Sequence, residues 1–120
     1  MPRQIITTPN APTSALYSQG VTAGSLVFVS GTPGIDPSTG SLAGNTIQAQ
    51  TRQALTNCEA ILLAGGATLD DVVEVGVLLT NPDDFSGMNE EYASWFPSDA
   101  PTRYAAKLEL RSRDYLSRSG

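Results

Sequence analysis

The chain has 120 residues, of which 40% are hydrophobic, carries a net charge of −5 at pH 7 and contains no histidine. Its length suits one domain, and neither a membrane span of roughly 18 apolar residues nor a signal peptide is evident, so we expect a soluble, cytoplasmic protein. The absence of histidine excludes His-dependent triads and the usual zinc sites, and the acidic charge disfavours nucleic acid as a partner.

The first half of the chain predicts a hairpin, a loop and a helix after an extended opening. Residues 20–30 read GVTAGSLVFVS, which is typical of a hairpin whose second strand, 26–30, is buried. Proline and glycine turn signals in residues 31–44 predict a loop with at least one tight turn. Apolar side chains then recur at helical spacing from an Asn45 cap to Ala64, before Gly65-Gly66, which predicts an amphipathic helix.

The second half predicts a strand, a helix and another strand. Thr68–Asp71 resembles a short capped turn, and the β-branched run at 72–80 predicts a central strand. A helical stripe ends before Pro97, and residues 102–110 alternate like a strand; the stripe comprises Phe85, Met88, Tyr92, Trp95 and Phe96. The order β-β-α-β-α-β predicts the α+β fold class, a mixed sheet with two helices on one face.

The last ten residues differ in composition from the rest of the chain. Residues 1–110 carry a net charge of −7 and are expected to form one domain, whereas residues 111–120 carry +2. The tail RSRDYLSRSG has neither an apolar alternation nor β-branched residues. We therefore predict that residues 111–120 do not form a strand.

Several short motifs occur in a characteristic order between Ala11 and Arg103. They are Tyr17-Ser18-Gln19, VFVSG at 27–31, Asp36-Pro37 with Thr39-Gly40, QTRQ at 50–53, MNEEY at 88–92 and Pro101-Thr102-Arg103. With these motifs the chain resembles the RidA/YjgF (reactive intermediate deaminase) family over about three quarters of its length.

The resemblance implies a homotrimer of chorismate-mutase-like domains, with a barrel-like core of sheets, helices outside and sites in the clefts between subunits. Members hydrolyse imines and enamines released by pyridoxal-phosphate enzymes and need no cofactor and no metal. The resemblance makes Arg103 the anchor for a substrate carboxylate, a role that suits the planar guanidinium fork. The expected partner is thus a small carboxylate-bearing substrate, not nucleic acid or a membrane.

The resemblance assigns further residues to this cleft. Arg103 and Ser30 are the expected catalytic residues, and the expected substrate-binding residues are Tyr17, Gly31, Asn89, Arg103, Tyr104 and Ala105. Gly31 would let a backbone amide approach the ligand, and Tyr17 would close the pocket from the next subunit.

Four of these residues also have a structural alternative. Arg103 could form a surface salt bridge, Ser30 could satisfy a strand end, Asn89 could cap a helix and Tyr17 could be core. Outside the site, we interpret Cys58 and the aromatic stripe as core. The acidic pairs Asp83-Asp84 and Glu90-Glu91 are interpreted as solvated charges.

The chain departs from the family near its end. Ala105 stands where members commonly have cysteine, and the expected final strand with its glutamate is not matched. Glu109 and Asp114 are the carboxylates that follow Arg103. A site without an acid-base carboxylate would lose the ~10²–10⁴ in rate that such a group typically supplies.

Three hypotheses of function follow. The first is hydrolysis of small 2-imino or 2-enamino acids to 2-oxo acids and ammonia. The second is a pathway-specific relative that hydrolyses, dehydrates or cyclises a biosynthetic intermediate in the same cleft, and the third is a ligand-binding trimer without chemistry. Ribonuclease activity is the least favoured reading, because the chain is acidic and lacks histidine.

Overall fold

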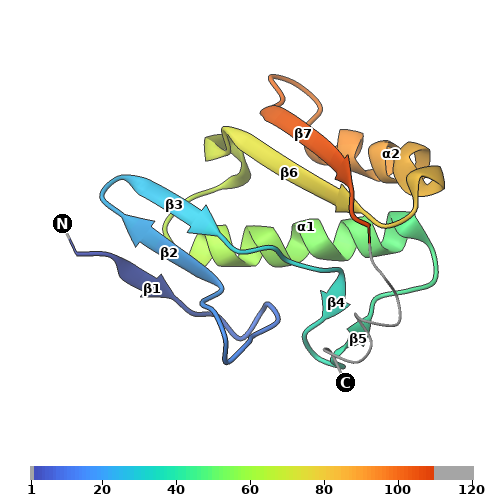
Figure 1. Cartoon of the computed structure of the whole chain (residues 1–120). Helices are drawn as coiled ribbons and strands as arrows, with labels where there is room; N and C mark the ends of the chain where they lie inside the picture. The colour runs from blue at the N-terminus through green and yellow to red at the C-terminus, as the bar shows by residue number, and fades with distance from the viewer. Residues whose placement is uncertain (1, 110–120) are drawn as a thin grey trace.

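The structure, a computed structural model, describes residues 2–109, which alternate short strands with two α-helices (Figure 1). The strands are β1 (Gln4–Ile6), β2 (Gly20–Ala23), β3 (Leu26–Val29), β4 (Ile35–Asp36), β5 (Ser41–Leu42), β6 (Glu74–Leu79) and β7 (Thr102–Lys107). The helices are α1 (Ile47–Ala64) and α2 (Phe85–Trp95), with short 3₁₀ turns at Leu69–Asp71 and Pro82–Asp84. The α+β prediction is confirmed, whereas the prediction for residues 111–120 lies outside the described residues.

The hairpin predicted for residues 20–30 is present as β2 and β3. These strands pair antiparallel from Gly20↔Val29 to Ala23↔Leu26, which leaves a two-residue turn at Gly24 and Ser25. Gly24 has φ of 60°, a left-handed conformation that favours glycine in such turns. The extended opening contributes β1, which pairs antiparallel with β2 and gives the sheet order β1-β2-β3.

Helix α1 occupies the predicted range, but its cap lies one residue later than expected. Thr46, not Asn45, is the N-cap, and its Oγ1 accepts a hydrogen bond of 3.1 Å from the Ala49 amide. Both residue types cap helices well, so composition could not choose between them. The predicted end is confirmed, because the Gly65 amide donates to the Ile61 and Leu62 carbonyls.

The core lies between α1 and the first sheet. Ile61 of α1 is 1% exposed and packs with the buried Ile6 and Ala11, flanked by the partly buried Val27, Val29 and Ala60. Leu26 and Phe28, on the other face of β3, are more than half exposed. The prediction of a buried strand at 26–30 is therefore wrong for the single chain, because α1 covers only one face.

The predicted strand, helix and strand of the second half form a parallel βαβ unit. β6 pairs parallel with β7 from Glu74↔Thr102 to Leu79↔Lys107, and α2 connects the two strands. Within residues 2–109, β7 is the one strand paired with β6. The prediction of a central strand at 72–80 is thus wrong for the described part of the chain.

Helix α1 joins the parts of the fold. It contacts β3, β4 and α2, and Figure 1 shows it extending across the molecule from the first sheet toward α2. The predicted loop at 31–44 contains the small β4–β5 hairpin, and Asn57 of α1 holds it. Asn57 is fully buried, and its Nδ2 donates to the Pro33 and Ile35 carbonyls at 3.1 and 2.8 Å.

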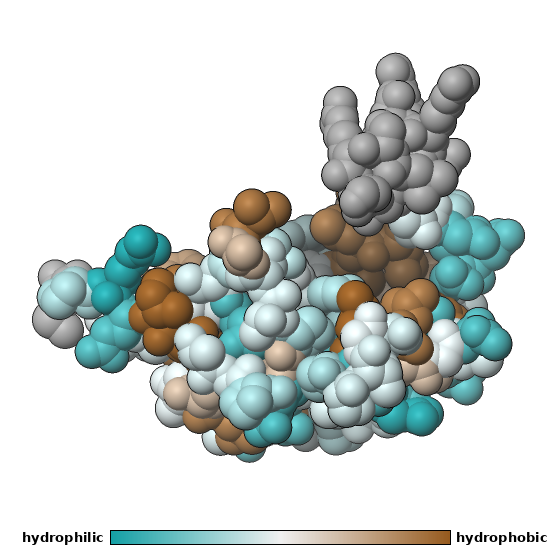
Figure 2. Space-filling view, turned by 90° about the horizontal axis from the view of Figure 1, so that it is seen from below, coloured by the Kyte–Doolittle hydropathy of each residue, from teal (hydrophilic) through white to brown (hydrophobic). Residues whose placement is uncertain are grey.

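The sheet faces that point away from the helices carry exposed apolar side chains. Leu78 lies on the same face as Tyr104, because Gly76 pairs with Tyr104 and side chains alternate along a strand. More than half of each of these large side chains is exposed: Ile5, Leu26, Phe28, Leu78 and Tyr104. Figure 2 shows apolar surface on the lower side of the molecule as separate brown patches among hydrophilic and neutral residues.

No helix within residues 2–109 is both long enough and apolar enough to cross a membrane.

Candidate functional site

Arg103 lies on β7, with its side chain directed toward α2. Its Nη1 donates a hydrogen bond of 2.6 Å to Asn89 Oδ1, and its guanidinium carbon lies 4.9 Å from the Tyr92 ring centre and 5.6 Å from that of Phe85. Phe85, Asn89 and Tyr92 follow one another at helical spacing and so share one face of α2. These four residues form the Arg103 cluster.

The guanidinium in this cluster keeps most of its hydrogen-bonding capacity. It has five N–H donors, and the bond to Asn89 is the one its side chain makes within residues 2–109. The ion pairs in that range join Arg52 to Glu91 and Lys107 to Glu109, so the salt-bridge alternative for Arg103 is wrong there. Asn89 likewise bonds Arg103 instead of capping a helix. The remaining N–H groups suit a planar carboxylate.

Tyr92 forms the inner wall of the cluster. It is 8% exposed, and its hydroxyl has no hydrogen-bond partner among the described residues. Burial raises the pKa of Tyr92, and the positive charge of Arg103 opposes this shift. From the sequence, Tyr92 and Phe85 are predicted only as core; their helical alignment with Asn89 is the signal that links them to Arg103.

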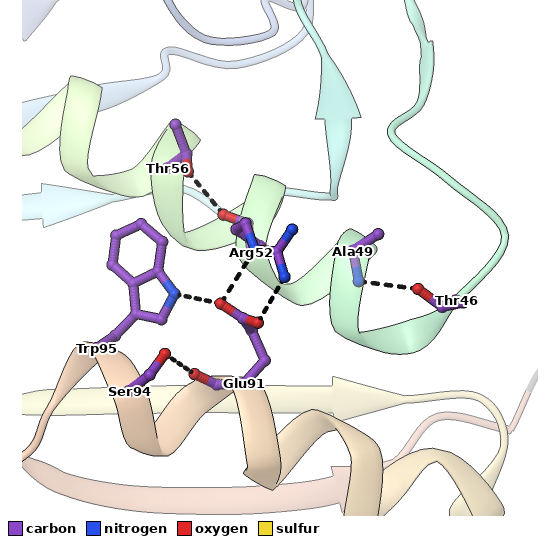
Figure 3. A network of polar contacts seen from close by, with 7 residues as sticks. All are labelled: Thr46, Ala49, Arg52, Thr56, Glu91, Ser94 and Trp95. Carbon is purple, nitrogen blue, oxygen red and sulfur yellow. Dashed lines mark hydrogen bonds and ion pairs between the residues drawn. The ribbon is translucent and has the colours of Figure 1, made fainter.

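Helix α2 is held against α1 by the carboxylate of Glu91 (Figure 3). Glu91 accepts hydrogen bonds from Arg52 Nη2 at 3.0 Å, Arg52 Nε at 3.3 Å and Trp95 Nε1 at 2.9 Å. The bonds from Arg52, and then that from Trp95, lower the pKa of Glu91. The interpretation of Glu91 as a solvated charge is therefore wrong, because this bidentate pair orients the helix that carries the Arg103 partners.

Tyr17 and Ser30 lie near the first sheet. Gln19, which is 6% exposed, donates through Nε2 to the Thr8, Ala11 and Pro12 carbonyls, each at 3.0 Å, and so holds the segment that carries Tyr17. Tyr17 is 56% exposed, so its core alternative is wrong for the single chain. The Ser30 hydroxyl donates a hydrogen bond to the Ser18 carbonyl, which agrees with the alternative that Ser30 satisfies a backbone group at a strand end. Gly31 has open space around its Cα.

Two of the predicted site residues, Tyr17 and Ala105, line separate open hollows. Tyr17 lines a hollow of about 420 Å³ with residues 5–7 and 13–19. Ala105 lines another of about 230 Å³, which we call the Ala105 pocket, and its remaining walls are Leu79, Pro82, Phe85, Ala106 and Lys107. Phe85 belongs to this pocket and also to the Arg103 cluster.

The described chain thus brings some of the predicted site residues together. Arg103, Asn89 and Ala105 come together around Phe85. Tyr104 lies on the opposite face of β7, where its ring covers Gly76 and leaves no room for a side chain there. Tyr17, Ser30 and Gly31 belong to the first sheet and its loops, and no hydrogen bond within residues 2–109 joins them to the cluster.

The described residues contain no group of three or more His, Cys, Asp or Glu side chains able to hold a metal ion. Cys58 is partly buried in α1, and burial raises the pKa of its thiol, with the Thr32 side chain opposing the shift. A raised pKa keeps the thiol protonated and poorly nucleophilic at neutral pH, as expected of a residue that serves packing.

Comparison with known proteins assigns the family. A family model described as Endoribonuclease L-PSP matches residues 8–116. A RutC family protein of Pyrococcus horikoshii is 42% identical over 115 residues, which cover 95% of this chain and 91% of that protein. The 2-iminobutanoate/2-iminopropanoate deaminase of Capra hircus is 39% identical over 107 residues, 88% of this chain and 78% of the relative.

Solved structures agree with this assignment. The crystal structure of E. coli TdcF with bound serine has a TM-score of 0.83 and 35% identity, and the match covers 91% of this chain and 89% of that one. The class is therefore an α+β domain of the Rid/YjgF type. The chain belongs to the Endoribonuclease L-PSP family, whose members here include RutC family and imine deaminase proteins, and this confirms the resemblance seen in the motifs.

Proposed function

We propose that the protein is a cytoplasmic homotrimer that hydrolyses small 2-imino or 2-enamino acids to 2-oxo acids and ammonia in clefts between its subunits. A 2-enamino acid first becomes the imine by a shift of one proton from nitrogen to carbon. The reaction then adds one water to the carbon–nitrogen double bond and releases the nitrogen as ammonia. The observation that carries this proposal is the Arg103 cluster, in which a guanidinium is held by Asn89 and two aromatic rings while its other donors remain available within residues 2–109.

The relatives support the same chemistry. The Capra hircus relative is named for 2-iminobutanoate and 2-iminopropanoate, and the E. coli TdcF structure holds serine. Each of these molecules has a carboxylate on the carbon that bears nitrogen. A guanidinium that binds the carboxylate in two-point fashion would therefore present the adjacent carbon in a defined orientation.

In the proposed mechanism, the protein accelerates the reaction mainly by positioning the substrate and the water. Arg103 holds the carboxylate, a water oxygen bonds to the imine carbon, and a proton passes to nitrogen. The hydroxyl proton of the resulting tetrahedral species then passes to nitrogen as the carbon–nitrogen bond breaks, which leaves the 2-oxo acid and releases ammonia. The Ser30 hydroxyl donates a hydrogen bond to the Ser18 carbonyl. The Ser30 oxygen can therefore accept a hydrogen bond from the attacking water. Such positioning accelerates a reaction whose intrinsic barrier is already low.

The catalytic rate is expected to be modest. The Arg103 cluster contains no carboxylate, and the Glu109 side chain is 88% exposed and lies 3.9 Å from Lys107. Protons would then come from solvent, without the ~10²–10⁴ in rate that a positioned acid-base group typically provides.

The direct test generates the imine in place. An amino-acid oxidase acting on alanine or 2-aminobutanoate supplies it, and release of ammonia and 2-oxo acid is followed with and without the protein. We expect release faster than background and proportional to protein concentration. If the folded protein gives no rate above background, this proposal is wrong, and the pathway-specific or ligand-binding hypothesis takes its place.

Two features support the trimer and its clefts. The exposed apolar faces of both sheets are of the kind that interfaces cover. In addition, Tyr17 and Ala105 line separate hollows of one chain, so a single site that uses both residues would need a neighbouring subunit. A homotrimer meets both requirements, because each cleft would place the Tyr17 hollow of one subunit against the Arg103 cluster of the next.

We predict that light scattering will give a trimer at micromolar concentration and that Phe28→Asp will dissociate it. Phe28 is 57% exposed on the open face of β3, where a buried charge would be costly. The matched control is Leu63→Asp, because Leu63 is equally exposed but lies on α1. A wild-type monomer, or dissociation by the control alone, would contradict the proposed interface.

A further inference from the structure

The Ala105 pocket lies directly beside the proposed carboxylate anchor. Arg103 and Ala105 are two residues apart on β7, so their side chains share one face and their Cα atoms are separated by about 7 Å. The Phe85 ring connects them, because it lies 5.6 Å from the guanidinium carbon and also forms a wall of the pocket. A molecule bound to Arg103 through its carboxylate can therefore extend over Ala105.

The pocket is apolar and small. Five of its six lining residues are uncharged, and Lys107 is the exception. The Lys107 ammonium lies 3.9 Å from the Glu109 carboxylate, so the part of Lys107 suited to line the pocket is its aliphatic stem. The volume of about 230 Å³ is below the roughly 300–1,000 Å³ of sites for drug-sized ligands, which suits a fragment of a metabolite.

The side chain at position 105 sets how much of this space is open. Ala105 contributes only a methyl group between the larger walls formed by Phe85 and Leu79. A longer side chain at this position would occupy the hollow itself.

We infer that the Ala105 pocket receives the side chain of the substrate and selects aliphatic groups of three or four carbons, larger than the methyl and ethyl groups in the name of the Capra hircus relative. This inference rests on the proposed role of Arg103 as carboxylate anchor. Ala105 and Phe85 are then determinants of specificity. Each additional methylene buried in the pocket is expected to improve binding by about fourfold.

The test measures equilibrium binding of pyruvate, 2-oxobutanoate, 4-methyl-2-oxopentanoate and 2-oxoglutarate to the wild-type protein by calorimetry. We expect affinity to rise along the three aliphatic acids. In Ala105→Leu, the preference for 4-methyl-2-oxopentanoate over pyruvate should fall by tenfold or more, with a smaller fall in Ala105→Val should the leucine variant not fold. The matched control is Ala93→Leu, since Ala93 is exposed on α2 and does not line the pocket; it should keep the wild-type preference.

The outcomes separate this inference from the proposed reaction. Equal affinity for all three aliphatic acids would overturn the aliphatic pocket. Tighter binding of 2-oxoglutarate than of 4-methyl-2-oxopentanoate would also overturn it, and would indicate a second anion site at Lys107. A preference that depends on Ala105, in a protein that hydrolyses no imine, would support the pocket and refute the hydrolase. Hydrolysis without any preference for chain length would support the hydrolase and refute the pocket.

Discussion

Arg103→Ala is expected to lower kcat/KM for imine hydrolysis by about 100-fold or more. The guanidinium can make two charge-assisted hydrogen bonds to a carboxylate, each worth about 1.5–3 kcal/mol, and alanine makes none. Arg103 is exposed, and the one hydrogen bond that its side chain makes within residues 2–109 is to Asn89. The free energy of unfolding of the variant should therefore lie within about 1 kcal/mol of the wild-type value. Steady-state kinetics and denaturant unfolding measure the two quantities separately.

The control for this variant is Arg52→Ala. Arg52 is also exposed and also forms side-chain hydrogen bonds with α2, but its partner is Glu91, which is not one of the four residues of the Arg103 cluster (Figure 3). Its loss should cost less activity than the loss of Arg103. If Arg103→Ala unfolds the protein while the remaining folded fraction still binds pyruvate with wild-type affinity, Arg103 has a structural role and the proposed function loses its main support.

Ile61→Ala is expected to lower the free energy of unfolding by about 2–5 kcal/mol. Ile61 is 1% exposed, and its Cγ2 packs so closely over Gly20 that a side chain there would collide with it. Removal of the larger part of this side chain leaves a cavity between α1 and the first sheet, which the glycine cannot fill. Urea unfolding of the purified variant measures the change.

Leu63→Ala provides the matched comparison on the same helix. Leu63 is 57% exposed, so its truncation should change the free energy of unfolding by about 0.5 kcal/mol or less. Equal losses for the two variants would show that the core does not lie where α1 meets β1 and β3. A larger loss for Ile61→Ala supports the packing described above.

The elements that were predicted correctly are those with strong local signals. The hairpin at residues 20–30 follows from two β-branched runs around Gly24, and α1 follows from helical spacing that ends at Gly65. The family motif ending in Arg103 similarly identified the residue around which the candidate site is built. These features depend on residues near one another in the chain, where backbone geometry and side-chain periodicity act directly.

The tertiary structure decided the contacts between distant residues. Glu91 looks like one more surface charge in the sequence, but α1 brings Arg52, 39 residues earlier, within 3.0 Å of it. Phe85 and Tyr92 form an apolar stripe by periodicity alone, yet the β6–α2–β7 crossover places the Arg103 guanidinium over both rings. Periodicity shows which side chains share a face of a helix, whereas packing determines what that face meets. The family motifs therefore named Arg103, Asn89 and Ala105 as candidates, and only the fold showed that Asn89 bonds Arg103 and that two aromatic rings and an apolar pocket lie beside it.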